Sequence, residues 1–186
     1  LYLQKVKDTA LVSVDSIQLD GKTEIVLSDD VESPEIYFLA LDKIAGERIS
    51  FFGEKGEITV NAKLEKFATS AKIKGSVNQD LLAEHKAMAQ KFNSKKLDLV
   101  VEKFNAYKIN DTALASKLER DEANLIKRKY YYTTNFAVVN ATHEVAPYLA
   151  LTELYDANIR LLDTINNSLS KEVKVSKYGK ELEKFI

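Results

Sequence analysis

Hydrophobic and polar positions follow two different periods along the chain, and the change comes near Gly75. Up to that glycine, short apolar runs alternate with turn residues, and five of the six glycines lie at or before it. After it, apolar side chains recur at three- and four-residue steps over long stretches. A period of two indicates β-strands, and a period near 3.6 indicates α-helices. The pattern predicts an α+β protein, with an antiparallel β domain over residues 1–75 and a helical domain over residues 76–186.

In the first part, the predicted strands are short and separated by turns. Asp20-Gly21 is expected to turn a run over residues 12–17 into a return strand over residues 23–27, because glycine accepts a positive φ. Further turns are expected at Ser33-Pro34, 45–48 and 54–56, between strands over residues 36–41, 49–52, 57–60 and 71–74. This spacing is typical of a β-sandwich or small barrel. Since residues 1–3 already have the pattern of a strand interior, we expect a further strand upstream of Leu1.

The second part is predicted to contain four to five helices, of which the first two form a long antiparallel hairpin. The first helix, capped by Ser76 or Asn78, is expected to bury Leu81, His85, Met88, Phe92, Val100, Phe104 and Tyr107. A break at residues 110–112 separates it from a second helix. That helix is expected to bury Leu114, Leu118, Leu125, Tyr132, Phe136 and Val139.

Shorter helices are expected in the remainder of the chain. Pro147 is suited to the first turn of a third helix that reaches Tyr155. A fourth helix is predicted over residues 158–169. The last is predicted to start at Ser176, with an apolar side formed by Tyr178, Leu182, Phe185 and Ile186.

Charge and composition argue against nucleic-acid binding and against a membrane span. The formal net charge is -1, whereas nucleic-acid binders normally carry a basic stripe. The basic residues 127–129 precede three tyrosines, a combination that can bind single strands. The favoured alternative is a helix with charges on its solvent face and half-buried tyrosines. No apolar run approaches the roughly 20 residues that span a bilayer.

The sequence contains no recognisable catalytic constellation, so we expect a non-enzymatic protein with no catalytic residue, cofactor or metal site. There is no cysteine, which excludes disulfides and thiolate chemistry within these residues. His85 and His143 lie on different predicted segments without further ligands at suitable spacing. Neither of the adjacent acid pairs, residues 29–30 and 121–122, has the arrangement of a glycosidase pair.

Aspartate followed by Ser or Thr and an aliphatic residue occurs four times, more often than composition predicts. The hydroxyl residues are Thr9, Ser16, Thr112 and Thr164. The triplet resembles the O-glycosylation acceptor motif of envelope proteins in Bacteroidota, which makes these four residues candidate modification sites. The alternative explanation is the preference of Asp and Thr for turns and helix caps.

The order of segments resembles DUF4369, a domain of unknown function in envelope proteins, mainly of Bacteroidota. The residues that carry the resemblance are Asp20-Gly21 and residues 34–37, 51–60, 73–76 and 78, with 146–149 and 176–182 downstream. In many relatives this module precedes a thioredoxin-like domain with a CxxC motif, which these 186 residues lack. The resemblance therefore implies a non-catalytic module and no active-site residue.

The expected function is binding of a partner protein in the cell envelope, periplasmic or associated with the outer membrane. The protein would be the front part of a thioredoxin-like oxidoreductase or a free-standing lipoprotein, attached to the membrane only through a lipid anchor upstream of Leu1. Alternatives are an accessory subunit of an outer-membrane complex, a small-ligand carrier and an enzyme with an unrecognised site. Tyr131 is the candidate partner contact, because Tyr132 follows the apolar face and neighbouring residues point about 100° apart.

Overall fold

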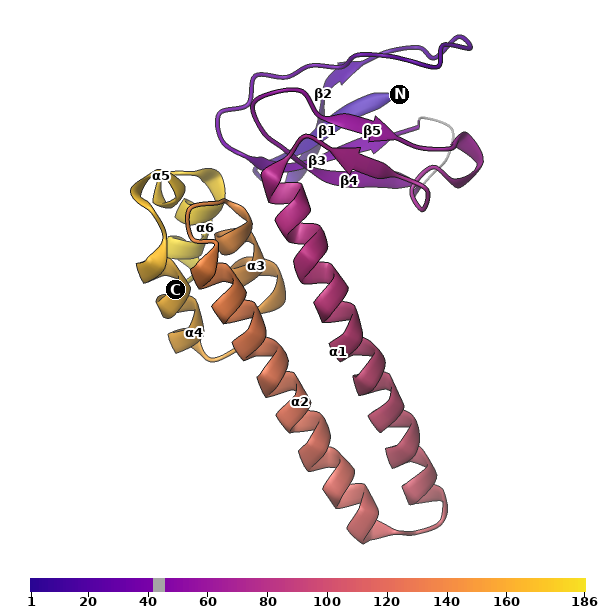
Figure 1. The fold of residues 1–186 in the computed structure, drawn as a ribbon, viewed down its shortest axis with the longest axis vertical. Coiled ribbons are helices and arrows are strands. Elements are labelled where there is room, and N and C mark those ends of the chain that lie inside the picture. Colours follow the sequence, from indigo (N-terminus) through magenta and orange to yellow (C-terminus); the bar gives the residue numbers. More distant parts are fainter. Residues whose placement is uncertain (42–45) are drawn as a thin grey trace. The chain divides into compact units, whose positions relative to one another are not determined.

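The computed structural model describes residues 1–41 and 46–186. Two compact units divide the chain, Leu1–Asp80 and Leu81–Ile186. The first contains the described strands and a short 3-10 helix, and the second contains the α-helices apart from the first residues of α1 (Figure 1). The α+β class is therefore confirmed, and each unit has its own hydrophobic core.

The described residues of the first unit form one four-stranded and one two-stranded antiparallel sheet. The larger sheet has the order β2-β1-β3-β4, and its strands are β1 (Tyr2–Lys7), β2 (Ala10–Ser16), β3 (Glu35–Ala40) and β4 (Arg48–Gly53). The smaller sheet pairs β5 (Thr59–Asn61) with β6 (Lys72–Lys74), and the short 3-10 helix η1 (Leu64–Lys66) lies between them. Among the described residues, the larger sheet is open at β2 and β4, so these strands do not close into a barrel.

The first hairpin turns at Asp8-Thr9, and the predicted hairpin at Asp20-Gly21 is wrong. Lys7 faces Ala10 across the turn, and Asp8 has a φ of 56°. Aspartate is one of the few residues besides glycine that enter this left-handed region readily, so the turn needs no glycine. Asp20-Gly21 does form a turn, but residues 23–27 belong to no strand. Ala45, part of another predicted turn, lies outside the described residues.

The core of the first unit lies on one face of the larger sheet. Leu3, Tyr37 and Phe51 are buried there. Partly buried side chains from outside the sheet pack against them, and these are Leu27, Val31, Ile58 and Ile73. The long connection between β2 and β3 thus contributes to the second layer together with the strands β5 and β6 and their flanking residues.

The described part of the second unit contains six helices, one more than the upper prediction. They are α1 (Val77–Lys108), α2 (Thr112–Val139), α3 (Val145–Glu153), α4 (Ile159–Ser168), α5 (Lys171–Lys174) and α6 (Lys177–Phe185). The single turn α5 was not predicted, because four residues are too few to show a period. Within the described residues, no helix is both long and apolar enough to cross a membrane.

α3 and α4 pack against α2, and α6 packs against α3, α4 and α5, around a continuous aliphatic core (Figure 1). Leu154, Leu162, Ile165 and Leu182 are almost completely buried in it. Asn158 caps α4 and Ser176 caps α6, in agreement with the predicted starts. Phe185 and Ile186, expected on the apolar side of the last helix, are instead exposed.

The predicted core of the hairpin is only partly correct. His85, Leu118 and Leu125 are buried as expected, and Leu81, Met88, Phe92, Tyr132 and Phe136 are partly buried. The remaining residues predicted to be buried are exposed, namely Val100, Phe104, Tyr107, Leu114 and Val139. The prediction went from Phe92 to Val100, a step of eight residues that turns about 80° around the helix and away from the buried face of α1. Steps of seven residues stay close to that face.

Candidate functional site

The inner face of α1 repeats every seven residues. His85, Phe92, Leu99 and Ala106 follow this spacing, and Leu99 and Ala106 pack with Ala115 and Leu118 of α2. Two polar contacts add to this packing. Lys103 Nζ lies 2.6 Å from Glu122 Oε2, and the Tyr107 hydroxyl donates to Glu119 Oε1 at 2.6 Å. The face of α1 toward α2 is therefore defined by both apolar and polar contacts.

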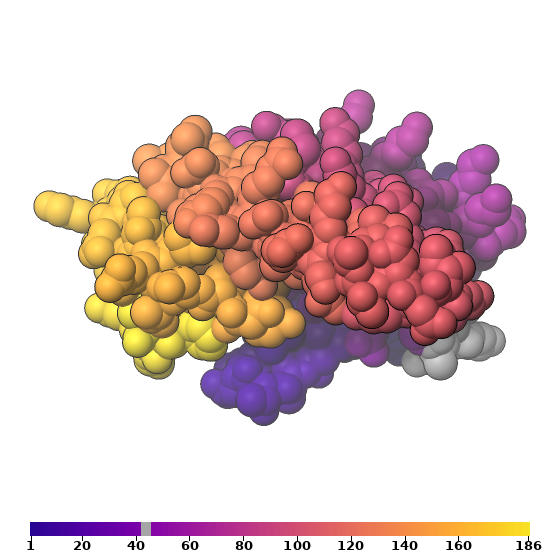
Figure 2. All heavy atoms as spheres, turned by 90° about the horizontal axis from the view of Figure 1, so that it is seen from below, coloured from indigo at the N-terminus to yellow at the C-terminus, as the bar shows by residue number. Residues whose placement is uncertain are grey.

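A second apolar face of α1 points away from α2. Residues two positions apart on a helix point about 160° apart, so Leu97 and Phe104 face away from Leu99 and Ala106. Val100 and Val101 lie between them, and we call these four residues, Leu97, Val100, Val101 and Phe104, the α1 stripe. Leu97 is 63% exposed and Phe104 is 59% exposed. Figure 2 looks onto the end of the hairpin, which is open to solvent in this view.

The three consecutive tyrosines on α2 have different surroundings. Tyr131 is 48% exposed, and Lys127 Nζ lies 5.8 Å from its ring centre. Tyr132 is partly buried and stacks on His85 with a centroid separation of 5.6 Å. The Tyr130 hydroxyl donates to Asp156 Oδ1 at 2.8 Å, and burial together with this bond raises the pKa of Tyr130 to about 12. Tyr131 is accessible, and its role as a partner contact remains a prediction.

His85 is a core residue that links α1 to α2. Its side chain is completely buried, with Nε2 2.9 Å from Thr133 Oγ1. Burial lowers its pKa, so the imidazole is neutral at pH 7. Nδ1 has no hydrogen-bond partner among the described residues. His143 lies apart, in the link between α2 and α3 as predicted, and its backbone N–H donates to Asn140 O.

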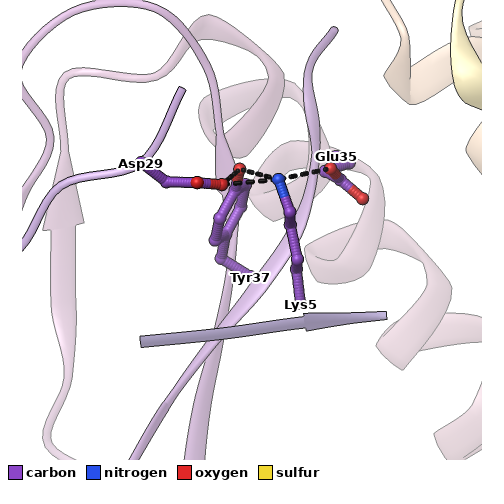
Figure 3. A network of polar contacts seen from close by, with 4 residues as sticks. All are labelled: Lys5, Asp29, Glu35 and Tyr37. Atoms are coloured by element: carbon purple, nitrogen blue, oxygen red, sulfur yellow. Dashed lines mark hydrogen bonds and ion pairs between the residues drawn. The ribbon is translucent and has the colours of Figure 1, made fainter. Parts of the chain in front are cut away.

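A polar cluster inside the β unit was not predicted. Figure 3 shows Lys5 of β1 between Asp29, Glu35 and Tyr37. Lys5 Nζ lies 2.5 Å from Asp29 Oδ2 and 3.6 Å from Glu35 Oε1, and the Tyr37 hydroxyl donates to Asp29 Oδ2 at 2.6 Å. Lys5 was not predicted as a site residue, because it lies two positions after the apolar Leu3, on the inner face of the strand, where the alternation favours another apolar side chain. The signal that could have found Asp29 is the alternation of residues 25, 27, 29 and 31, in which it is the one polar member.

The hydrogen bonds of this cluster stabilise the ionised forms of Asp29 and Lys5. Burial alone would raise the pKa of Asp29, but hydrogen bonds from Lys5 and Tyr37 outweigh it and hold that pKa below its usual value. Burial would lower the pKa of Lys5, yet its bonds to Asp29 and Tyr37 raise it. Burial and the bond to Asp29 also raise the pKa of Tyr37. Lys5 and Tyr37 remain protonated at neutral pH, so the cluster holds the structure together and offers no base.

The adjacent acids 29 and 30 point to opposite faces. Asp29 points to Lys5, and Asp30 is exposed, so the two cannot share a proton. In the second acid pair, Glu122 binds Lys103. Over residues 1–41 and 46–186, no group of three or more His, Cys, Asp or Glu side chains has the arrangement of a metal site.

The four candidate modification residues are all exposed. Thr9 lies in the β1–β2 turn, Ser16 ends β2 and Thr112 begins α2. Thr164 lies within α4, where its hydroxyl donates to Arg160 O at 2.7 Å. Asp111 caps α2 by accepting from Leu114 N, which is the capping role that competes with modification as an explanation of that triplet. O-glycosylation of these residues remains a prediction.

Comparison with known proteins finds a match in the N-terminal part of the chain. The family model called Domain of unknown function (DUF4369) matches residues 1–82. No curated protein and no solved structure matches the chain. The matched residues include every strand of the β unit, from β1 to β6, and the start of α1. Residues 1–82, which are less than half of the chain, are therefore similar to the DUF4369 family.

Proposed function

We propose that this protein is a non-catalytic module of the cell envelope that binds a partner protein through the α1 stripe. The observation that carries the proposal is an apolar face with a helical period, exposed on the side of α1 opposite to its contacts with α2. Contiguous apolar patches of this kind mark interaction sites more often than scattered apolar residues do.

The spacing of the stripe suggests the kind of partner that fits it. Leu97, Val101 and Phe104 are separated by four and three residues, the spacing with which one helix packs along another. Lys96 and Asp98 are exposed beside the stripe and supply both signs of charge at its border. We propose an amphipathic helix of the partner protein as the occupant, with Tyr131 as a separate candidate contact on α2.

The envelope location depends on the family rather than on the geometry. In many relatives the DUF4369 module precedes a thioredoxin-like domain, in lipoproteins or periplasmic thiol:disulfide oxidoreductases. We propose the same setting here, with an accessory subunit of an outer-membrane complex as the alternative role. Fractionation of native cells tests the location, and recovery of the protein only in the cytoplasmic fraction would contradict it.

Matched variants in α1 test the binding surface. Phe104→Glu places a charge in the stripe, and Asn105→Glu places the same charge on an exposed neighbouring position outside it. Partner recovery from native membranes should fall at least tenfold in Phe104→Glu and stay near wild type in Asn105→Glu, with both variants folded by circular dichroism. Equal recovery in the two variants would reject the stripe. If the wild-type protein forms a dimer that Phe104→Glu dissociates, the occupant is a second copy and the proposed partner helix is wrong.

A further inference from the structure

The connection between β2 and β3 contains a segment that has the side-chain alternation of a strand but belongs to no strand of either sheet. Along residues 25–32, side chains alternate strictly between partly buried and exposed, beginning with partly buried Ile25 and ending with exposed Glu32. This period of two is that of an extended β-strand. Yet these residues belong to no sheet, and Figure 1 draws the connection as a long trace without an arrow.

Side chains hold this segment in place. Leu27 and Val31 pack against the core of the β unit, and Asp29 binds Lys5 and Tyr37. Asp15 of β2 accepts a hydrogen bond from the Ser28 N–H at 2.8 Å. The 25–32 segment is thus ordered by contacts on its inner face, before any partner binds, which lowers the entropy cost of binding.

The backbone of the segment remains available. Within the part of the chain that the structure describes, two backbone groups of residues 25–32 make hydrogen bonds, the Ser28 N–H to Asp15 and the Asp30 N–H to the Asp29 carboxylate, and both acceptors are side chains. Edges with free N–H and C=O groups are templates on which another extended chain can pair. Several peptide-binding domains use this mode, in which a peptide adds a strand to an exposed edge.

The outward side chains specify what kind of peptide would fit. Val26 is 86% exposed, and Asp30 and Glu32 are exposed on the same face. Residues 23–35 contain five acidic side chains and no lysine or arginine. Asp29 and Glu35 face Lys5, and the other three, Glu24, Asp30 and Glu32, are exposed. Opposite charges on paired strands stabilise each other, and like charges directly opposite are unfavourable.

We propose that the 25–32 segment binds an extended peptide segment of another protein, which pairs with it as a β-strand and carries lysine or arginine at alternate positions. The backbone supplies the hydrogen bonds, and Asp30 and Glu32 select the basic side chains. This site lies in the β unit and does not depend on the α1 stripe.

A labelled nine-residue peptide that alternates lysine with threonine and valine is the probe, measured by fluorescence anisotropy with the full 186-residue protein. Two further peptides carry N-methyl groups on one or the other backbone edge, and a third replaces lysine by glutamate. We expect the lysine peptide to bind, and one N-methylated peptide and the glutamate peptide to bind at least tenfold more weakly. Equal binding of both N-methylated peptides would show that charge alone attracts the probe. That result, or the absence of binding by the lysine peptide, would overturn the proposal.

Charge-reversal variants and hydrogen exchange locate the site. Asp30→Lys with Glu32→Lys should weaken binding of the lysine peptide at least tenfold, whereas Glu181→Lys with Glu183→Lys, on exposed positions of α6, should leave it unchanged. In the wild-type protein, the peptide should slow amide exchange within residues 25–32. Slowing only elsewhere would reject the site. If amide exchange within residues 25–32 becomes slower as the protein concentration rises, with no peptide present, then a second copy occupies the edge. That result would overturn the basic-peptide assignment.

Discussion

At the scale of single residues, neighbours in the sequence have sharply different roles. Asp29 is enclosed by Lys5 and Tyr37, whereas Asp30 faces solvent. Tyr132 stacks on His85, whereas Tyr131 is half exposed. Each pair offers a variant and a matched control that differ by one position in the chain.

Asp29→Asn should destabilise the β unit at neutral pH by about 1–3 kcal/mol, because it removes the charge that Lys5 and Tyr37 face. Native-state hydrogen exchange of amides in β1 and β3 measures the change. Asp30→Asn is the control and should change stability by less than about 0.5 kcal/mol, as is usual for surface substitutions. Similar losses in the two variants would contradict the assigned role of Asp29.

The same pair predicts a pH dependence. The pKa of Asp29 is lowered in the folded protein, so its contribution is complete above the unfolded value of about 3.9 and is lost as the pH falls below it. The stability difference between wild type and Asp29→Asn should therefore shrink from about pH 5 to pH 2. A difference that stays constant over this range would show that the charge is not what stabilises the unit.

Tyr132→Ala should cost about 2–4 kcal/mol, because Tyr132 packs on His85, Phe92 and Phe136. The loss should be below the upper end for aromatic truncations, since the ring is only partly buried. Tyr131→Ala should change stability by less than about 0.5 kcal/mol. Thermal unfolding of the helical unit, followed by circular dichroism, compares the two, and equal destabilisation would reject the assignment of their faces.

At the scale of elements, close packing can require a residue that helix propensity disfavours. Gly179 lies in the first turn of α6, and a glycine in a helix is ordinarily unfavourable by about 1 kcal/mol relative to alanine. The sequence therefore suggests a weak point in this helix. In the structure, a Cβ at Gly179 would collide with the backbone oxygens of Val173 and Lys174, so only glycine allows α5 and α6 to pack this closely.

Gly179→Ala should for this reason destabilise the helical unit by about 1–3 kcal/mol, the usual cost of overpacking, instead of stabilising it. Lys180→Ala, at the next and exposed position, is the matched control and should be nearly neutral. Chemical denaturation followed by circular dichroism measures both variants. A stabilised Gly179→Ala protein would show that propensity outweighs the backbone contact.

At the scale of the whole molecule, the chain consists of two compact units with separate cores. The β unit is stabilised by the cluster around Lys5 and by Leu3, Tyr37 and Phe51. The helical unit is stabilised by the aliphatic core around Ile165 and by the aromatic contacts of His85. Separate cores favour separate unfolding reactions.

Asp29→Asn should therefore increase exchange by global opening in the β unit alone, and Tyr132→Ala in the helical unit alone. In the double variant, each unit should lose the same stability as in the corresponding single variant, to within about 0.5 kcal/mol, because the two sites share no partner. Native-state hydrogen exchange with peptide resolution provides the measurement. Accelerated exchange of both units in each single variant would mean that the chain unfolds as one cooperative body.

The sequence by itself determined the α+β class, the change from strands to helices near Gly75, the long hairpin and the helix starts at Asn158 and Ser176. It also determined the resemblance to DUF4369, which the family match confirms for residues 1–82. The strands and helices were predictable because their patterns depend on residues two to four positions apart, which the chain brings together in any strand or helix. Local order in the sequence is therefore sufficient to predict them.

Only the tertiary structure decided which strands pair, which face of α1 meets α2 and which charges meet inside the β unit. Lys5 and Asp29 lie 24 positions apart, and Lys103 and Glu122 lie 19 apart, so no local period encodes either pair. A helix with apolar residues on two faces, such as α1, has the same hydrophobic pattern in its sequence whichever face is buried. Burial is decided by packing between distant segments, and the α1 stripe and the unpaired 25–32 segment became visible only once that packing was known.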